Sequence, residues 1–317
     1  MTKYTSKDVH VDQLLTNVSI GYSNAGYIAD QIFPVVPVDK QSDKYLTYDK
    51  SHWFRNEAKI RATGTKSERG GWNYSSDTYF CDRFSYGHEI YDEERDNADN
   101  AFQLDSDAAE FATDKILMQR EVAFAGGFFT TSVWGTDKTG GTDFTHWSDY
   151  AGSAPLVDVS DWMDTIEASI GREANRLVMG KQVWTKLKWH PDLIDTIKYT
   201  QRAQMGLDLA ATLLEVDRIL VGRAIYTTSP EGTAEASVSY SRIWGKHALL
   251  IYVPNTPSLR QPAAGYTFTW QRVPQSLRYI KRMRDEEREA DIIEANAYYD
   301  HKVTGAAAGL FGSTVIA

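Results

Sequence analysis

The stretch from Tyr48 to Gly87 constrains the fold more than any other part of the sequence. It carries a dense series of aromatic residues and is interrupted by Gly64 and by the Gly70-Gly71 pair. This pattern predicts a long two-stranded excursion over residues 48–88 that turns near its middle. Two strands alone cannot bury a hydrophobic core and are at best marginally stable in water. The excursion is therefore expected to be stabilised by contacts with residues outside it.

The most regular helical pattern in the chain follows this excursion. Apolar residues recur at intervals of three and four between Leu104 and Val122, which predicts a helix from Ser106 to about Gly126. Asp105 or Ser106 is suited to capping its start, and Gly126-Gly127 is suited to ending it. This helix is the longest element that the sequence predicts.

The rest of the chain alternates short helical and strand patterns, which indicates an α+β fold. Residues 1–47 predict an extended arm with one short helix at Val11–Val18. Residues 135–157 have the Gly, Thr, Ser and Asp composition of a crossing between two units. Further helices are expected at Asp161–Ile170, Lys181–Trp189 and Leu207–Glu215. Strands are expected at Arg176–Met179, Ile219–Tyr226, Ile243–Val253, Tyr266–Trp270, Leu277–Met283, Asp291–Ala297 and Ala306–Ile316.

Composition excludes several classes of protein. The longest apolar run, Ala248–Val253, is far shorter than the ~20 residues that span a bilayer. The N-terminal residues hold no secretory apolar segment, so the protein is expected to stay where it is made. Cys81 is the only cysteine, so no disulfide within the chain and no cysteine metal cluster can form. A small buried apolar role is expected for this residue.

No local signature of enzyme chemistry stands out. The motifs for phosphate, dinucleotide, acyl-transfer and zinc chemistry are absent. The densest set of metal-ligating side chains lies between His88 and Glu94. Such side chains diverge along a strand or loop, so a solvated acidic face is the favoured explanation. A metal-dependent enzyme that uses His88, Asp92 and Glu93 is the alternative; otherwise no catalysis, resident metal or cofactor is expected.

Charge is distributed unevenly along the chain. The whole protein has a formal net charge of -9, which argues against a protein whose main task is to grip phosphate backbones. Between Lys50 and Arg69 six basic residues face two acidic ones, a net of +4, whereas ten acidic residues face three basic ones between Asp92 and Glu121, a net of −7. Opposed patches of this kind steer association between surfaces, unless both are simply solvated.

Several short segments follow one another in a particular order along the chain. They are Ile32–Val38, Phe84–Tyr91, Asp96-Asn97-Ala98, Asn175–Gly180, His190-Pro191, Ile243–Lys246, Leu249–Pro254, Asp291–Glu294, Tyr299-Asp300 and Ala308-Gly309-Leu310. No single segment is diagnostic, but in this order they make the chain resemble the major capsid proteins of tailed bacteriophages, which have the Hong Kong 97 type of shell fold.

The resemblance implies an α+β capsid fold with four parts. These are an N-terminal arm, an extended β-hairpin loop, a peripheral domain with a long spine helix, and an axial domain. Transferred to this sequence, they are expected at residues 1–47 for the arm, 48–88 for the loop, 89–155 and 265–305 for the peripheral domain, and 156–264 and 306–317 for the axial domain.

The resemblance also implies a structural protein that assembles as hexamers and pentamers into the icosahedral head around double-stranded DNA. The loop of one subunit would lie over a neighbour. The expected loop contacts are Trp53, Arg55, Lys59, Arg61, Lys66, Arg69 and Trp72. The expected acidic acceptors are Asp92, Glu93, Glu94, Asp105, Asp107, Glu110 and Asp114.

The expected partners are further copies of the chain, a separate scaffolding protein, a portal and decoration proteins, with no membrane and no sequence-specific DNA binding. A separate scaffold is expected because no long charged helical region precedes the arm. The expected location is the virion, after assembly in the host bacterial cytoplasm. An encapsulin-like nanocompartment, which holds a protein instead of a genome, is the alternative with the same fold.

Overall fold

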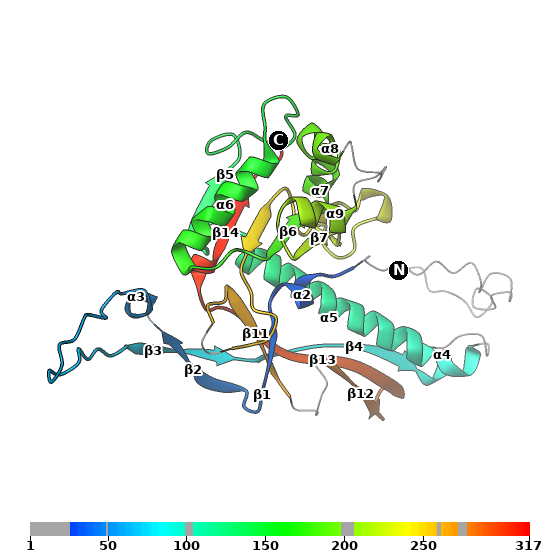
Figure 1. Ribbon diagram of the computed structural model, residues 1–317. Helices are drawn as coiled ribbons and strands as arrows, with labels where there is room; N and C mark the ends of the chain where they lie inside the picture. Colours follow the sequence, from blue (N-terminus) through cyan, green and yellow to red (C-terminus); the bar gives the residue numbers. More distant parts are fainter. Residues whose placement is uncertain (1–25, 49, 99–103, 198–205, 259–260, 272–277) are drawn as a thin grey trace.

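The computed structural model describes residues 26–48, 50–98, 104–197, 206–258, 261–271 and 278–317. These residues form two five-stranded sheets, two separate two-stranded hairpins and a set of helices (Figure 1). Within them, no helix combines the length and the apolar character needed to cross a bilayer.

The larger sheet is built around one long strand, β13. The strand order is β1-β11-β13-β12, and β4 pairs with β13 on its other side. The strands are β1 (Val35–Val38), β4 (Asp82–Tyr91), β11 (Gly265–Trp270), β12 (Arg278–Asp285) and β13 (Ala290–Val303). β1 runs parallel to β11, while the other pairs are antiparallel. The N-terminal arm thereby becomes an edge strand of this sheet.

Helix α5 (Leu104–Phe128) covers one face of the larger sheet (Figure 1). Its buried residues Ala108, Ala112 and Ile116 recur every four positions, so they form one stripe along the helix. Against them pack Ile90, Ile293, Ala295 and Ala297 of the sheet. The alanines on both surfaces let the helix lie close to the strands. The predicted long helix is confirmed and extends slightly beyond the expected ends.

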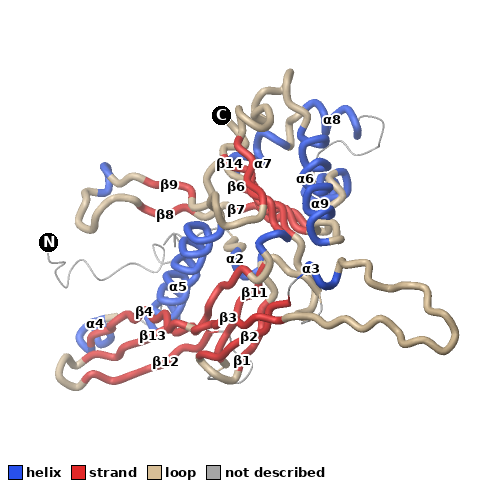
Figure 2. Tube along the Cα trace, turned by 90° about the vertical axis from the view of Figure 1, so that its left-hand side faces the viewer, coloured by secondary structure: helices blue, strands red, loops and turns tan. Residues whose placement is uncertain are grey.

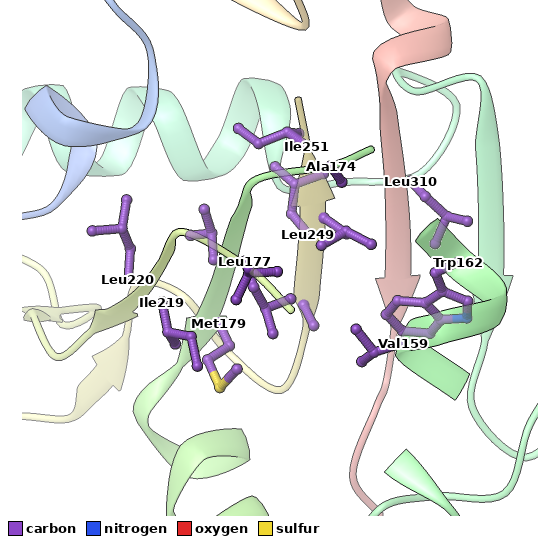
Figure 3. Close-up of a cluster of buried hydrophobic side chains, with 14 of the residues drawn as sticks. Val159, Trp162, Ala174, Leu177, Met179, Ile219, Leu220, Leu249, Ile251 and Leu310 are labelled. Atoms are coloured by element: carbon purple, nitrogen blue, oxygen red, sulfur yellow. The ribbon is translucent and has the colours of Figure 1, made fainter. Parts of the chain in front are cut away.

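The smaller sheet has the order β5-β14-β10-β6-β7. Its strands are β5 (Thr136–Thr139), β6 (Arg176–Gly180), β7 (Arg218–Gly222), β10 (Ala248–Ile251) and β14 (Gly309–Ser313). Consecutive residues of β6, β7 and β10 are buried, as in a sheet covered on both faces. Figure 3 shows part of this core, in which Leu310 of β14 lies beside Trp162, and Leu177 lies beside Met179 further along the sheet.

Short helices surround the smaller sheet. They are α6 (Pro155–Ile170), α7 (Lys181–Leu187), α8 (Pro191–Ile197), α9 (Leu207–Leu213) and the 3-10 turn η2 (Ala306–Ala308). α6 ends where Gly171 adopts a left-handed conformation with φ 68°, which glycine adopts without steric cost. The predicted helices in this region are confirmed, and α6 begins six residues earlier than predicted, at a proline in its first turn.

Two hairpins stand outside the sheets. The first pairs β2 (Ser42–Tyr48) with β3 (Tyr74–Phe80), and the second pairs β8 (Ile225–Thr227) with β9 (Tyr240–Arg242). The short elements α2 (Ala29–Ile32), α3 (Lys50–Trp53), α4 (Asp92–Asn97) and η1 (Glu235–Ser237) complete the fold.

Several sequence predictions need correction. The excursion is not paired over residues 48–88: pairing lies in β2 and β3, while β4 belongs to the larger sheet. Residues 135–157 are more than a crossing, because β5 pairs with β14 and Trp147 is fully buried. The predicted strand at Ile219–Tyr226 is divided between β7 and β8, and only Ala248–Ile251 of the next predicted strand is extended in a sheet. The predicted helix at Val11–Val18 lies outside the described residues.

Glu121 of α5 holds the arm, the helix and the smaller unit together. Its buried carboxylate accepts hydrogen bonds from the backbone N–H of Ala29 at 2.9 Å and of Ile28 at 3.1 Å. It also accepts one from the indole N–H of Trp244 at 2.7 Å. Burial raises the pKa of Glu121, and these three donors oppose that rise because they stabilise the charged form. Glu121 belongs to the stretch whose acidic charge predicts a surface patch, but the structure places it in the interior.

The adjacent residue on α5 reinforces this junction. Arg120 is also buried and pairs with Asp30 of α2 at 2.5 Å. Its guanidinium lies over the ring of Tyr299, 4.8 Å from the centroid, where a cation is attracted to the aromatic face. Phe33 of the arm packs edge-on against Phe124 of the same helix. Polar and apolar contacts therefore fix the arm at the same place.

We expect Glu121→Ala to lower the free energy of unfolding of the unassembled subunit by roughly 2–4 kcal/mol, because buried donors lose their acceptor. Glu110→Ala, at an exposed position of the same helix, is the matched control and should change it by no more than about 0.5 kcal/mol. Urea unfolding followed by tryptophan fluorescence measures both. Equal stability of the two variants would contradict the assigned role of Glu121.

Candidate assembly surface

The most exposed part of the described chain lies between β2 and β3. We call residues 50–73 the projecting loop; it begins with α3 and extends away from both sheets (Figures 1 and 2). Every residue from Trp53 to Thr78 is exposed. Such a segment gains little stability from burial within its own chain.

Large apolar side chains are concentrated on the projecting loop despite this exposure. Trp53 and Trp72 are 60% and 62% exposed, and their ring centroids are 6.1 Å apart. Phe54 is 63% exposed and lies over Gly171 at the end of α6. Ile60, further along the loop, has no cover at all. Exposed aromatic clusters of this kind mark surfaces that bind other proteins.

The root of the loop is well anchored, in contrast to its tip. Tyr79 of β3 stacks on Phe268 of β11 with a centroid distance of 4.6 Å. Cys81 beside them is fully buried, and burial raises the pKa of its thiol to about 12. Tyr45 donates a hydrogen bond to Asp77 across the hairpin at 2.8 Å. The hairpin thus positions the loop. The first residues of the loop touch the end of α6, where Lys50 donates hydrogen bonds to Ser169 and Phe54 lies against Gly171, while its outer part is exposed.

Two of the predicted contact cations are paired within the loop. Arg55 lies 3.2 Å from Glu57, and Lys59 lies 3.3 Å from Glu68. The other predicted cations form no ion pair among the described residues: Arg61, Lys66 and Arg69. The positive charge available to a partner is therefore at the outer part of the loop.

The predicted acidic acceptors are partly neutralised by their own chain. Arg284 binds Asp92 through two hydrogen bonds of 2.5 and 2.6 Å, and this contact lowers the pKa of Asp92. Asp105 pairs with Arg95 at 2.7 Å, and Asp114 accepts a hydrogen bond from Tyr27. The remaining predicted acceptors have no ion pair within the described residues: Glu93, Glu94, Asp107 and Glu110.

The metal-site alternative does not match the structure. The ring of His88 packs edge-on against Phe111 of α5, 5.8 Å between centroids, while Asp92 is bound to Arg284. Glu93 is exposed on α4. Among the described residues, no group of three histidine, cysteine or acidic side chains is placed to hold a metal ion. His88, Glu89 and Asp92 instead contact three different partners, namely Phe111, Arg288 and Arg284.

One serine and one histidine lie close together, as in a catalytic pair, but their protons are not placed for the histidine to act as a base. Ser153 Oγ lies 2.9 Å from His190 Nε2 and donates its own proton to the backbone oxygen of Asp149. His190 Nδ1 accepts the backbone N–H of Asp192, so the ring proton is on Nε2. A general base for this serine would need a free lone pair at Nε2. The pair is therefore a structural link to the start of α8.

Comparison with known proteins adds sequence relatives to this geometry. The major capsid protein of Burkholderia phage BcepMu is 29% identical over 308 residues, which cover 94% of both chains. The major capsid protein of Pseudomonas phage JBD67 is 28% identical and covers 82% of this chain and 83% of its own. No protein-family model matches the chain.

Solved structures with the same fold cover nearly the whole chain. A phage-related protein from Bordetella bronchiseptica RB50 superposes with a TM-score of 0.68 at 24% identity, over 96% of this chain and 97% of that one. The capsid of cyanophage P-SCSP1u gives 0.60 at 12% identity, covering 98% and 95%. An encapsulin of Synechococcus elongatus PCC 7942 gives 0.53 at 9%, covering 96% of each chain. These likenesses confirm the predicted α+β capsid fold of the Hong Kong 97 type.

We expect Cys81 to react with iodoacetamide at pH 8 roughly a thousandfold more slowly in the folded subunit than in denaturant, because its raised pKa leaves little thiolate. Mass spectrometry of timed samples measures the modification, and Cys81→Ala gives the background. Rapid modification of a subunit that remains folded would show that the root of the loop opens.

Proposed function

We propose that this chain, a relative of phage major capsid proteins with their fold, is the structural protein of an icosahedral phage head. Copies of the chain assemble as hexamers and pentamers into a shell that encloses double-stranded DNA in the virion. The role is mechanical and involves no catalysis. Its binding free energy comes from many repeated contacts between copies.

One observation carries this proposal beyond the relatives' names: the chain presents an exposed aromatic loop on a rigid root. Trp53, Phe54 and Trp72 are the residue types that contribute most binding energy at protein interfaces. In the proposal the loop lies over a neighbouring copy and is covered by it. The cations Arg61, Lys66 and Arg69 then face the unpaired acidic residues of α4 and α5 in that neighbour.

The proposed domain roles follow the same assignment. In this proposal the arm is a separate part, the larger sheet with α5 forms the peripheral domain, and the smaller sheet forms the axial domain near the symmetry axes. β5 belongs to the axial domain because it pairs with β14. Partners outside the shell, namely a scaffolding protein, a portal and decoration proteins, also belong to the proposal, as does assembly in the host cytoplasm. Electron microscopy of the protein expressed with and without its neighbouring genes tests the need for a scaffold.

An encapsulin-like compartment has the same fold, as the Synechococcus structure shows. Sequence similarity favours the phage head, because the relatives at 28% and 29% identity are phage capsid proteins. Nucleic acid inside purified native particles would support the phage head. A protein cargo instead of nucleic acid would support the hypothesis of an encapsulin-like compartment.

We expect deletion of residues 57–71, with a short glycine linker, to abolish most shells while leaving the subunit folded. The deletion is structurally mild, because the Glu57 carboxylate lies against Gly70 and the two limbs are adjacent there. Sedimentation measures the assembled fraction, and thermal unfolding of the subunit should be nearly unchanged. Abundant normal particles from the deletion variant would contradict the role of the loop.

We also expect the triple variant Arg61→Ala, Lys66→Ala and Arg69→Ala to assemble several-fold less well than the native chain at low ionic strength. The native chain should lose assembly as salt is added, and the variant should respond less, because screening acts on the removed charges. The charge-conserving variant Arg61→Lys, Lys66→Arg and Arg69→Lys is the control. Equal assembly of all three proteins would show that the loop charges do not take part.

A further inference from the structure

Four cations lie together at the β6–β7 end of the smaller sheet. We call Lys181, Lys188, Arg223 and Arg242 the cationic patch. The strand register pairs Gly180 with Gly222, so Lys181 and Arg223 follow side by side. Arg242 pairs through β9 with Ile225, two positions beyond Arg223. Lys188 lies seven residues, or about two turns, after Lys181 and so is on the same side of α7.

The cations of this patch are unpaired within the part of the chain that the structure describes. None of the four cations forms an ion pair within the residues that the structure describes. Arg223 and Arg242 are exposed, and the two lysines are half-buried. Burial and the neighbouring charges of Arg223, Lys188 and Arg242 all lower the pKa of Lys181. A group of like charges without ion pairs creates a positive potential that attracts a negatively charged partner.

A matching acidic stripe lies on α6. Asp161, Asp164 and Glu167 follow one another at intervals of three, so they share one side of the helix. All three are exposed, whereas Trp162 and Ile166 of the same helix are buried. No ion pair involves these three acids within the described chain.

The stripe and the patch lie on opposite sides of the smaller unit. α6 contacts β14 and β10, while the patch follows β6 and β7 at the other end of the strand order. Figures 1 and 2 both place α6 and the β8–β9 region on opposite sides. Within the described residues, no ion pair joins the two surfaces. A second copy, placed head to tail, brings one against the other.

We propose that the cationic patch of one copy binds the acidic stripe on α6 of the next copy around a ring. The inference rests on the proposed shell function but concerns a different contact from that of the projecting loop. A second copy is favoured over a nucleic acid because the chain itself supplies a matching acidic surface and its net charge of -9 repels phosphate backbones. Repeated head-to-tail contacts close into a ring when the rotation between copies allows it. Exposed charge pairs of this kind mainly set orientation and partner choice.

Charge reversal and restoration test this contact. The basic-side variant is Arg223→Glu with Arg242→Glu, and the acidic-side variant is Asp161→Lys with Asp164→Lys. Each should reduce the assembled fraction at least fivefold in sedimentation at fixed ionic strength, with the thermal midpoint of the subunit unchanged. The chain carrying all four substitutions should recover assembly to within twofold of the native chain. Failure of the fourfold variant to exceed either parent would overturn the proposal.

A mixing experiment separates this proposal from the shell function. The two reversed variants should associate with each other in analytical ultracentrifugation, because each then offers what the other lacks, while neither associates with itself. This result supports the contact even if the native chain forms no shells, an outcome that would contradict only the proposed function. If the basic-side variant instead forms normal particles that contain less nucleic acid, the patch binds nucleic acid and the proposal is wrong.

Discussion

The buried carboxylate of Glu121 is the contact on which the arrangement of the molecule depends. From its place on α5 it accepts hydrogen bonds from the backbone N–H groups at the start of α2 and from the indole N–H of Trp244, just before β10. A buried charge is costly unless its hydrogen-bonding capacity is filled, so these three segments must come together for the carboxylate to be tolerated. Arg120 and Asp30 add a second polar contact at the same point. The relative position of the two sheets, and hence the direction of every surface, follows from this junction.

Some parts of the structure bury their apolar surface within one chain, and other parts leave it exposed. The smaller sheet is buried on both faces, and α5 covers one face of the larger sheet, so both units are stabilised within one chain. The projecting loop has an anchored root at Tyr79 and an exposed outer part that includes Ile60. Exposed apolar surface of this extent marks a site that binds another molecule. This contrast explains why the proposed function is assembly and why it involves several distinct surfaces.

Charged residues show where sequence reasoning was limited. The charge count from Asp92 to Glu121 predicts an acidic patch, yet Asp92 is bound by Arg284, nearly two hundred residues away in the chain, and Glu121 is buried. Partners so distant in sequence cannot be inferred from local spacing. The acidic stripe on α6 has a helical period that the sequence displays, but its significance depends on the unneutralised cations at the other end of the sheet. Only strand register brings Lys181 beside Arg223.

The sequence by itself determined the local elements and the class of fold. Helical periodicity predicts α5, a glycine predicts the end of α6, and the aromatic run predicts a projecting segment that has no core of its own. These three signals could be read because each depends only on residues that are neighbours in the sequence. The tertiary structure decided what those elements contact. It placed β4 in the larger sheet, β5 beside β14, and a buried charge at the junction of arm and helix. Such pairings join residues far apart in the chain, and their energies depend on burial and geometry that exist only once the chain has folded.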